Sequence, residues 1–188
     1  MAAGEASGEN AFRRGGTSHV LLPVYDTITD HSRWDDTLDI VATAIGAIGG
    51  GLYVRRLDDV PFDFSAMSSV YRPELVREYF ERGLGALEAP QWNYLNSQPP
   101  LEPVLDDQAD VPREILDVRE DYVFNRERAG IGRRVALRLN AIPSWYDAAI
   151  FAFSARLTDV PEASLHALRP LLPHLAKAVE AGRAFAIL

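Results

Sequence analysis

The sequence contains no cysteine, which excludes disulfides, thiolate nucleophiles and cysteine-based metal sites together. It also has no apolar run of about 18 residues, the length that a membrane-spanning helix needs. Its first 16 residues lack the apolar core of a signal peptide. These absences predict a cytoplasmic protein that neither spans a membrane nor is exported.

Basic residues are outnumbered: 19 Lys and Arg face 27 Asp and Glu, for a formal net charge of -8. Nucleic-acid binding depends on clustered Lys and Arg that neutralise phosphates. We therefore expect no nucleic-acid contact by this segment.

Catalytic signatures are also missing. No serine stands in a Gly-x-Ser-x-Gly frame, as a nucleophile elbow requires. The four histidines are scattered and form no His-x-x-x-His pair: His19, His31, His166 and His174. The sequence predicts no enzyme, no metal site and no cofactor.

What the chain does have is enough apolar material for one domain. Its 188 residues are 47% hydrophobic, which suits a single globular unit with a sizeable core. Residues 1–18 hold almost nothing large to bury, so we expect a flexible N-terminal arm there. The domain is expected to occupy residues 19–188.

Hydrophobic spacing predicts the elements of the first half. Apolar residues recur at helical spacing from Ser32, a plausible N-cap, until the glycines at 49–51 end the helix. Residues 52–57 and 62–71 are predicted to be strands of a hairpin. Residues 72–82, with Pro73 in the first turn, are predicted to form a short amphipathic helix.

The second half begins with a proline-rich stretch, 83–112, that predicts a long connection pinned by buried aromatics. A helix is expected over 113–129, stopped by Gly130 and Gly132. Two strands should follow, over 133–140 and 147–155. The second strand is apolar on both faces, which predicts a central position in the sheet.

The last 27 residues carry the clearest pattern, an apolar stripe of Leu165, Leu168, Leu172, Leu175 and Val179 at helical spacing. This stripe predicts either dimerisation or packing on its own domain. Pro170 and Pro173 each remove an amide donor, so we expect a kink, with the last straight run beginning near Pro170 or Leu171.

The order of these elements predicts an α+β fold, an antiparallel sheet covered by helices that ends in a long C-terminal helix. Four segments also carry a resemblance: WDDTL at 34–38, AIGAIGG at 44–50, RPELVREYF at 72–80 and LLPHLAKA at 171–178. In their order and spacing, residues from about Val20 onward resemble the PAS-like or GAF-like N-terminal sensory domain of bacterial LuxR-type transcriptional regulators.

The resemblance implies a cytoplasmic domain that binds a small molecule or a partner and passes a change of shape to a helix-turn-helix output domain. It transfers no ligand-binding residue. In such folds the ligand lies between the sheet and the helices over it. We expect the binding residues to be Tyr53, Phe64, Tyr79, Trp92, Tyr94, Phe124 and Phe153, with Arg138 and Asn140 as polar partners.

Aromatics at these spacings are more often plain core, and in that case Arg134 and Arg138, which share one face of their strand, would only pair with surface acids. If the aromatics do line a cavity, an arginine favours an anionic or carbonyl-bearing ligand, because guanidinium presents a fork of donors. We expect a homodimeric sensory domain that transmits through its C-terminal helix. The alternative is a protein-interaction or dimerisation module without a small-molecule ligand.

Overall fold

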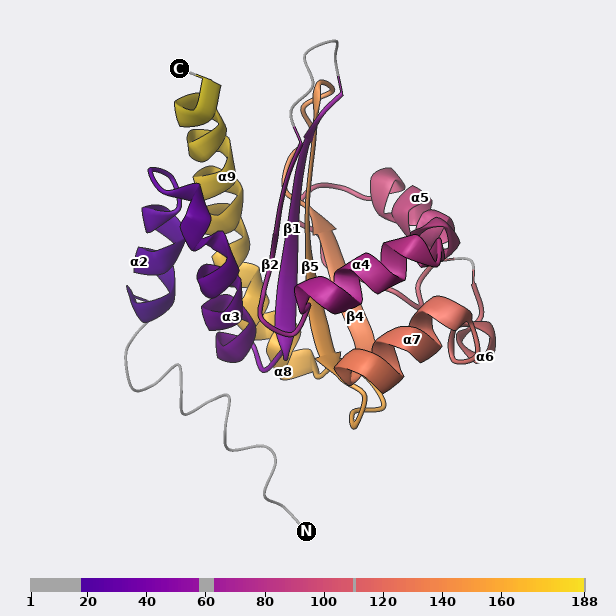
Figure 1. Ribbon diagram of the computed structural model, residues 1–188. Coiled ribbons are helices and arrows are strands. Elements are labelled where there is room, and N and C mark those ends of the chain that lie inside the picture. The colour runs from indigo at the N-terminus through magenta and orange to yellow at the C-terminus, as the bar shows by residue number, and fades with distance from the viewer. Residues whose placement is uncertain (1–17, 58–62, 110, 188) are drawn as a thin grey trace.

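The computed structural model describes residues 18–57, 63–109 and 111–187, and its five strands form one antiparallel sheet in the order β2-β1-β5-β4-β3. Helices cover both faces of this sheet (Figure 1). The prediction of an α+β fold is therefore confirmed. Of the predicted arm, residues 1–17 lie outside the described residues, and Ser18 already begins the first described helix, α2 (Ser18–Asp26).

After α2, a short 3-10 helix, η1 (His31–Arg33), leads into α3 (Trp34–Ala44). The N-cap of η1 is Asp30, whose side chain accepts a hydrogen bond from the Ser32 amide at 3.1 Å, so Ser32 is not the cap that the sequence indicated. The helix also ends earlier than predicted. Gly46 takes a φ of 75°, a backbone conformation that favours glycine at a helix end.

The glycines at 49–51 belong to a strand and not to a helix stop. β1 (Gly49–Arg56) pairs with β2 (Asp63–Met67), from Gly51 opposite Met67 to Arg55 opposite Asp63, which confirms the predicted hairpin. A Cβ at Gly49 would lie 2.1 Å from Cγ1 of Val70. Glycine is therefore required at this position by close packing.

The predicted amphipathic helix is confirmed as α4 (Pro73–Glu81). The long connection predicted after it is wrong, because that stretch contains η2 (Leu84–Glu88), α5 (Ala89–Ser97) and the short strand β3 (Val104–Leu105). In α5 the proline of the pattern, Pro90, occupies the first turn, where its missing amide costs nothing. Leu95 is the one buried residue of α5, so the helix shows little apolar periodicity.

The helix predicted over 113–129 is divided into α6 (Arg113–Leu116) and α7 (Glu120–Ala129). The division falls at Arg119, whose backbone is extended. Gly130 ends α7 as predicted, whereas Gly132 lies within β4 (Ile131–Arg138). The last strand, β5 (Trp145–Ser154), lies between β1 and β4, which confirms its predicted central position.

The C-terminal segment consists of α8 (Glu162–Leu168), η3 (Arg169–Leu171) and α9 (Leu172–Ile187), so the predicted interruption near Pro170 is confirmed. Its apolar stripe packs inside the subunit. Leu168, Leu172, Leu175 and Val179 are at most 4% exposed and belong to the main core, and Leu165 packs against it. These five side chains do not present a free seam to a second copy.

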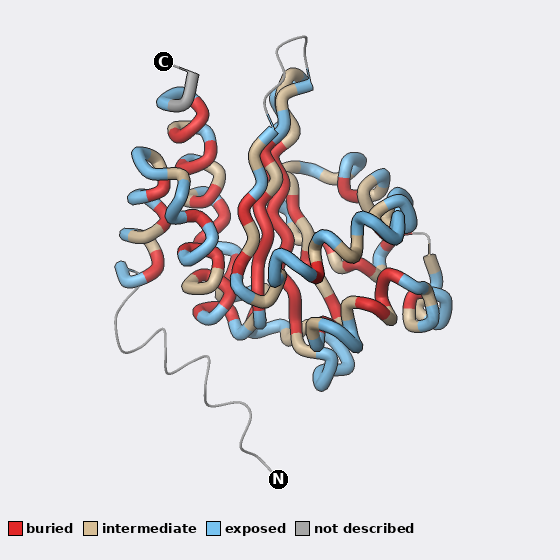
Figure 2. Tube along the Cα trace, in the orientation of Figure 1, coloured by how far each residue is buried: buried red, intermediate tan, exposed pale blue. Residues whose placement is uncertain are grey.

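The sheet separates two layers of helices. On one face lie α2, α3 and α9, and on the other lie α4, α5 and α7 (Figure 1). The main core fills the first layer, where Leu52, Val135 and Phe151 from the sheet meet Trp34 and Leu175 from the helices. Buried residues run through the central strands and the helix sides that face them (Figure 2). The alternate side chains of β1, β4 and β5 point into the second layer.

Candidate functional site

A cavity of about 420 Å³ lies in the second layer, between the sheet and the helices α4, η2, α5 and α7. Its size and largely apolar wall are those of a small-molecule site. The sheet, α4 and α7 contribute most of the wall. The lining residues are Tyr53, Met67, Val70, Tyr71, Leu75, Val76, Tyr79, Phe80, Gly83, Gly85, Ala86, Glu88, Trp92, Phe124, Asn125, Ala129, Arg134 and Ile150.

Four of the nine residues expected to bind a ligand line this cavity: Tyr53, Tyr79, Trp92 and Phe124. They come from four different elements, β1, α4, α5 and α7, and meet in pairs. The ring centroids of Tyr53 and Trp92 lie 5.7 Å apart in an edge-on contact, and those of Tyr79 and Phe124 lie 5.6 Å apart. Such contacts help to fix the orientation of the rings in the wall.

Two expected aromatics, Phe64 and Phe153, lie on the opposite face of the sheet. Phe153 is part of the main core, and Phe64 packs against that core with its ring 5.7 Å from the His31 ring. The strand period explains the difference, because residues one position apart on a strand point to opposite faces. The sequence identified the strands without indicating which face carried a cavity.

The remaining three expected residues have structural partners outside the cavity. Tyr94 packs on a small cluster around Leu95 and Ala148. Arg138 donates to the Asn96 carbonyl oxygen at 3.0 Å, which joins β4 to α5. Asn140 donates to the Asp147 carboxylate. None of the three is among the residues that line the cavity.

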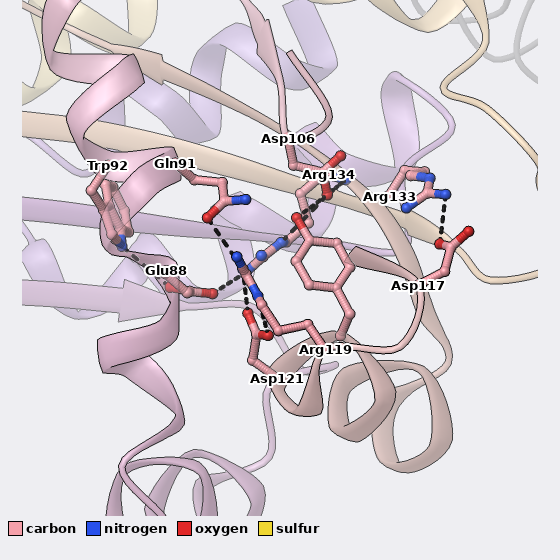
Figure 3. Close-up of polar contacts among 10 residues, drawn as sticks. Glu88, Gln91, Trp92, Asp106, Asp117, Arg119, Asp121, Arg133 and Arg134 are labelled. Atoms are coloured by element: carbon pink, nitrogen blue, oxygen red, sulfur yellow. Dashed lines mark hydrogen bonds and ion pairs between the residues drawn. The ribbon is translucent and has the colours of Figure 1, made fainter. Parts of the chain in front are cut away.

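The charged residues that do line the cavity are Glu88, at the end of η2, and Arg134, on β4, and they form an ion pair. Each side chain is only 12% exposed. The second carboxylate oxygen of Glu88 accepts a hydrogen bond from Trp92 Nε1 at 3.2 Å. Figure 3 shows the three side chains meeting where η2 and α5 face the sheet. The ion pair therefore anchors an aromatic wall residue as well as two elements.

From the sequence, Arg134 was expected only as a partner of surface acids, and nothing indicated Glu88. The alternation of β4 placed Arg134 and Arg138 on one face, and nothing in the pattern distinguished them. The distinction depends on η2, which brings Glu88 against Arg134 and was not predicted.

Behind the ion pair, Asp106 closes the other side of Arg134. Its carboxylate lies 3.8 Å from Arg134 Nε. The same carboxylate accepts a hydrogen bond from the Arg134 backbone amide at 3.1 Å and another from the Tyr122 hydroxyl at 2.8 Å. The Arg134 guanidinium carbon lies 4.9 Å from the centroid of the Tyr122 ring. The guanidinium is thus enclosed by two carboxylates and an aromatic face.

A further ion pair, between Arg119 and Asp121, supports this arrangement (Figure 3). Arg119 binds both carboxylate oxygens of Asp121, at 2.7 and 2.8 Å, and donates to Gln91 Oε1 at 3.1 Å. Bidentate geometry of this kind holds the planes of the two groups fixed. Because Gln91 and Trp92 are neighbours on α5, the hydrogen bond from Arg119 to Gln91 helps to hold α5 over the cavity.

The Glu88–Arg134 pair remains ionised in the fold. Burial by itself would raise the pKa of Glu88, but the charge of Arg134 and hydrogen bonds from Arg134 and Trp92 hold it below its ordinary value. The pKa of Arg134 is raised well above its ordinary value: burial opposes its charge, and the charge of Glu88 overcomes that opposition. Burial raises the pKa of Asp106.

Three phenols lie at the ion-pair end of the cavity, those of Tyr53, Tyr71 and Tyr79. Burial raises the pKa of each, to about 12 for Tyr71 and further for the other two, so all three stay protonated near neutral pH. The Tyr79 hydroxyl is buried without a hydrogen-bond partner, although Glu88 is close enough to contribute to raising its pKa. It is a donor that a bound molecule could satisfy.

A separate buried ion pair lies on the far face of the sheet, between Asp147 on β5 and Arg183 on α9. The Arg183 guanidinium carbon also lies 4.6 Å from the centroid of the Trp145 ring. Tyr146 lies between Trp145 and Asp147 on β5 and points to the cavity side of the sheet. Its ring centroid lies 6.2 Å from that of Trp92. The start of β5 therefore contacts a wall residue of the cavity on one face and α9 on the other.

The described residues contain neither a cluster of metal-binding side chains nor a membrane-spanning helix. No group of three or more His, Asp or Glu side chains is placed to hold a metal ion among them. No helix within the described ranges has both the length and the apolar character needed to cross a membrane.

Neither a protein-family model nor a curated protein matches the sequence. Among solved structures, the VqsR LBD domain from Pseudomonas aeruginosa has a TM-score of 0.64 at 14% identity, covering 91% of this chain and 99% of that one. CepR2 from Burkholderia cenocepacia, described as an N-acylhomoserine lactone dependent LuxR family transcription factor, has a TM-score of 0.56 at 15% identity, covering 87% and 93%.

A third similar structure is SdiA in complex with octanoyl-rac-glycerol, with a TM-score of 0.57 at 17% identity, covering 94% of this chain and 64% of that one. This chain thus spans about two thirds of the length of SdiA. The likeness to all three structures establishes the fold, which is that of the ligand-binding domains of LuxR-type regulators.

Proposed function

We propose that this chain is the ligand-binding regulatory domain of a LuxR-type transcriptional regulator and that its cavity holds a small effector. The observation that carries the proposal is the cavity of about 420 Å³, which remains open between the sheet and α4, η2, α5 and α7. A filled core in that place would have favoured a purely structural role. No titratable cluster there has the free acid and base that an enzyme needs.

The comparisons support a small organic molecule as the class of effector. CepR2 is described as dependent on an N-acylhomoserine lactone, and SdiA is seen with octanoyl-rac-glycerol. Both are small molecules with an apolar chain and a compact polar head. The wall of the present cavity, with its apolar side chains and a few polar groups, suits that general class.

In this proposal, occupancy is transmitted to α9 through the sheet, because α9 lies on the opposite face from the cavity. The start of β5 supplies the contact: Tyr146 meets Trp92 on the cavity side, while Asp147 pairs with Arg183 of α9. A buried ion pair resists separation, so a shift of this strand end would move α9 with it. We also propose a cytoplasmic homodimer that binds no nucleic acid through this segment.

The alternative, a dimerisation module without a ligand, has less support. It required the stripe of the C-terminal segment to form an exposed seam, and Leu168, Leu172 and Leu175 are buried within one subunit. A homodimer would therefore use a different surface.

A cavity-filling substitution tests the proposal. Ile150 lines the cavity from β5, so Ile150→Trp should occupy the space that an effector needs. In a thermal-shift screen of small uncharged amphiphiles that includes octanoyl-rac-glycerol, we expect some to raise the melting temperature of the wild type and none to raise that of Ile150→Trp. Thr43→Trp, at an exposed position on α3, is the matched control and should respond like the wild type. Equal responses of Ile150→Trp and wild type would refute the proposal.

A further inference from the structure

We infer that the cavity selects uncharged effectors and rejects both carboxylates and amines, because its two charged wall residues, Glu88 and Arg134, neutralise each other. The inference rests on the proposed function and adds the chemical class of the effector. Among the described residues that line the cavity, these two are the only charged ones. The first expectation from the sequence, an arginine that attracts an anion, depended on Arg138, which lies outside the cavity wall.

An anionic effector has no free cation to bind. Arg134 already contacts Glu88 on one side and lies 3.8 Å from the Asp106 carboxylate on the other. A carboxylate that reached the guanidinium would displace Glu88 and leave it buried without a partner. Leaving one member of a buried ion pair unpaired is strongly unfavourable.

A cationic effector, in turn, finds no free carboxylate to bind. Both carboxylate oxygens of Glu88 are occupied, one by Arg134 and one by Trp92 Nε1 at 3.2 Å. An ammonium group that took either oxygen would release the buried guanidinium or the indole N–H. The wall is therefore closed to charge of both signs.

Neutral oxygen, in contrast, has partners available. The hydroxyl of Tyr79 is buried without a hydrogen-bond partner, and the phenols of Tyr53 and Tyr71 lie at the same end of the cavity. A buried donor gains most from an acceptor brought to it, since it has already lost its water. The rest of the wall is largely apolar, formed by side chains such as Leu75, Phe124 and Ile150, and it also includes the amide side chain of Asn125. The structure thus assigns the effector as an uncharged molecule with a carbonyl or hydroxyl oxygen at one end and an apolar remainder.

A matched pair of fluorescent probes tests the charge rule. N-phenyl-1-naphthylamine is uncharged, and 8-anilino-1-naphthalenesulfonate has the same ring system with one added sulfonate. We expect the wild type to bind the uncharged probe at least tenfold more tightly than the sulfonate at pH 7. We expect Ile150→Trp to bind neither at this site, and Thr43→Trp to behave as the wild type.

Substitution of Glu88 should change the preference in a defined direction. Glu88→Gln removes the anion that covers Arg134, so the affinity for the sulfonate should rise at least tenfold relative to the uncharged probe. The double variant Glu88→Gln/Arg134→Met removes both charges; it should keep the uncharged probe and show no gain for the sulfonate. The Glu88→Gln protein could unfold because the buried Arg134 loses its paired carboxylate. The double variant, which has no buried arginine at this position, keeps the test valid in that case.

The two proposals fail in different ways. If the wild type bound the sulfonate as tightly as the uncharged probe, and Ile150→Trp abolished both, the cavity would be a binding site and the charge rule would be wrong. An unchanged preference in a folded Glu88→Gln protein would also overturn the rule. If Ile150→Trp left the binding of both probes unchanged, the cavity itself would not be the site and the proposed function would fail.

Discussion

Arg134 and Arg138 lie four residues apart on the same face of β4, yet only Arg134 reaches the cavity. The alternation of β4 predicted their shared face correctly. What separates them is the partner opposite each: Glu88 from η2 for Arg134, and the Asn96 carbonyl from α5 for Arg138. Neither partner was predictable while η2 and α5 were expected to be a loop. The sequence therefore indicated the type of residue in the wall and not the individual residue.

The Glu88–Arg134 pair should make the stability of the fold depend on pH. The folded-state pKa of Glu88 lies below its ordinary value of 4.5, so its contribution is fully present above pH 4.5 and is lost as the pH falls through the folded-state pKa. We expect the wild type to be more stable than Glu88→Gln at pH 7. The difference in free energy of unfolding, measured with urea, should shrink below pH 4.5. A difference that stayed constant from pH 7 to pH 3 would contradict this role for Glu88.

Tyr79 should affect binding without supporting the fold. Its hydroxyl has no hydrogen-bond partner in the protein, so Tyr79→Phe removes a buried polar group and should leave the melting temperature unchanged or raise it. An oxygen-bearing effector identified by the thermal-shift screen should bind roughly 2- to 10-fold more weakly to this variant, the loss expected for one hydrogen bond. Tyr122→Phe is the contrasting variant: it removes the hydrogen bond to Asp106 and should lower the melting temperature. Equal affinity of Tyr79→Phe and wild type, by calorimetric titration, would argue against the phenol as an anchor.

Among the elements, those with a strong period were predicted well and those without one were missed. β4 alternates along its whole length, and α4 carries an amphipathic pattern, so both were identified from the sequence. α5 has a single buried residue, Leu95, and its proline and polar residues were interpreted as loop. The aromatic residues of that stretch were nevertheless expected to matter, and Trp92 does line the cavity.

The C-terminal stripe gives a prediction at the same scale. Leu175 on α9 is 2% exposed and packs in the main core, so Leu175→Ala should lower the free energy of unfolding by about 2–5 kcal/mol. Its effect should be on folding and not on self-association. We expect light scattering across a dilution series to give the same mass for Leu175→Ala as for the wild type under folding conditions. A clear fall in mass with unchanged stability would restore the stripe as a dimer interface.

Transmission to α9 is testable through its buried ion pair. Arg183→Met alone leaves Asp147 buried without its partner and should cost roughly 3–5 kcal/mol of stability. The double variant Asp147→Asn/Arg183→Met should recover most of this loss. In hydrogen exchange, an effector should slow exchange in α9 of the wild type and, while still binding, leave α9 of the double variant unaffected. An undiminished response in the double variant would show that the ion pair does not couple the sheet to α9.

At the scale of the whole molecule, the sheet separates the main hydrophobic core from the cavity. The main core lies with α2, α3 and α9 on one face, while the cavity lies on the other. The sequence predicted the architecture, since that depends on the periods of long elements. It could not predict which sheet face remains hollow, because a cavity results from how the intervening short helices are placed.

If the proposed function and the charge rule both hold, this cavity binds one small uncharged molecule. Native mass spectrometry of wild type and Ile150→Trp, each equilibrated with N-phenyl-1-naphthylamine, tests it most directly because it counts bound molecules per chain. We expect one bound probe per wild-type chain and none on Ile150→Trp. Equal occupancy of the two proteins would contradict it.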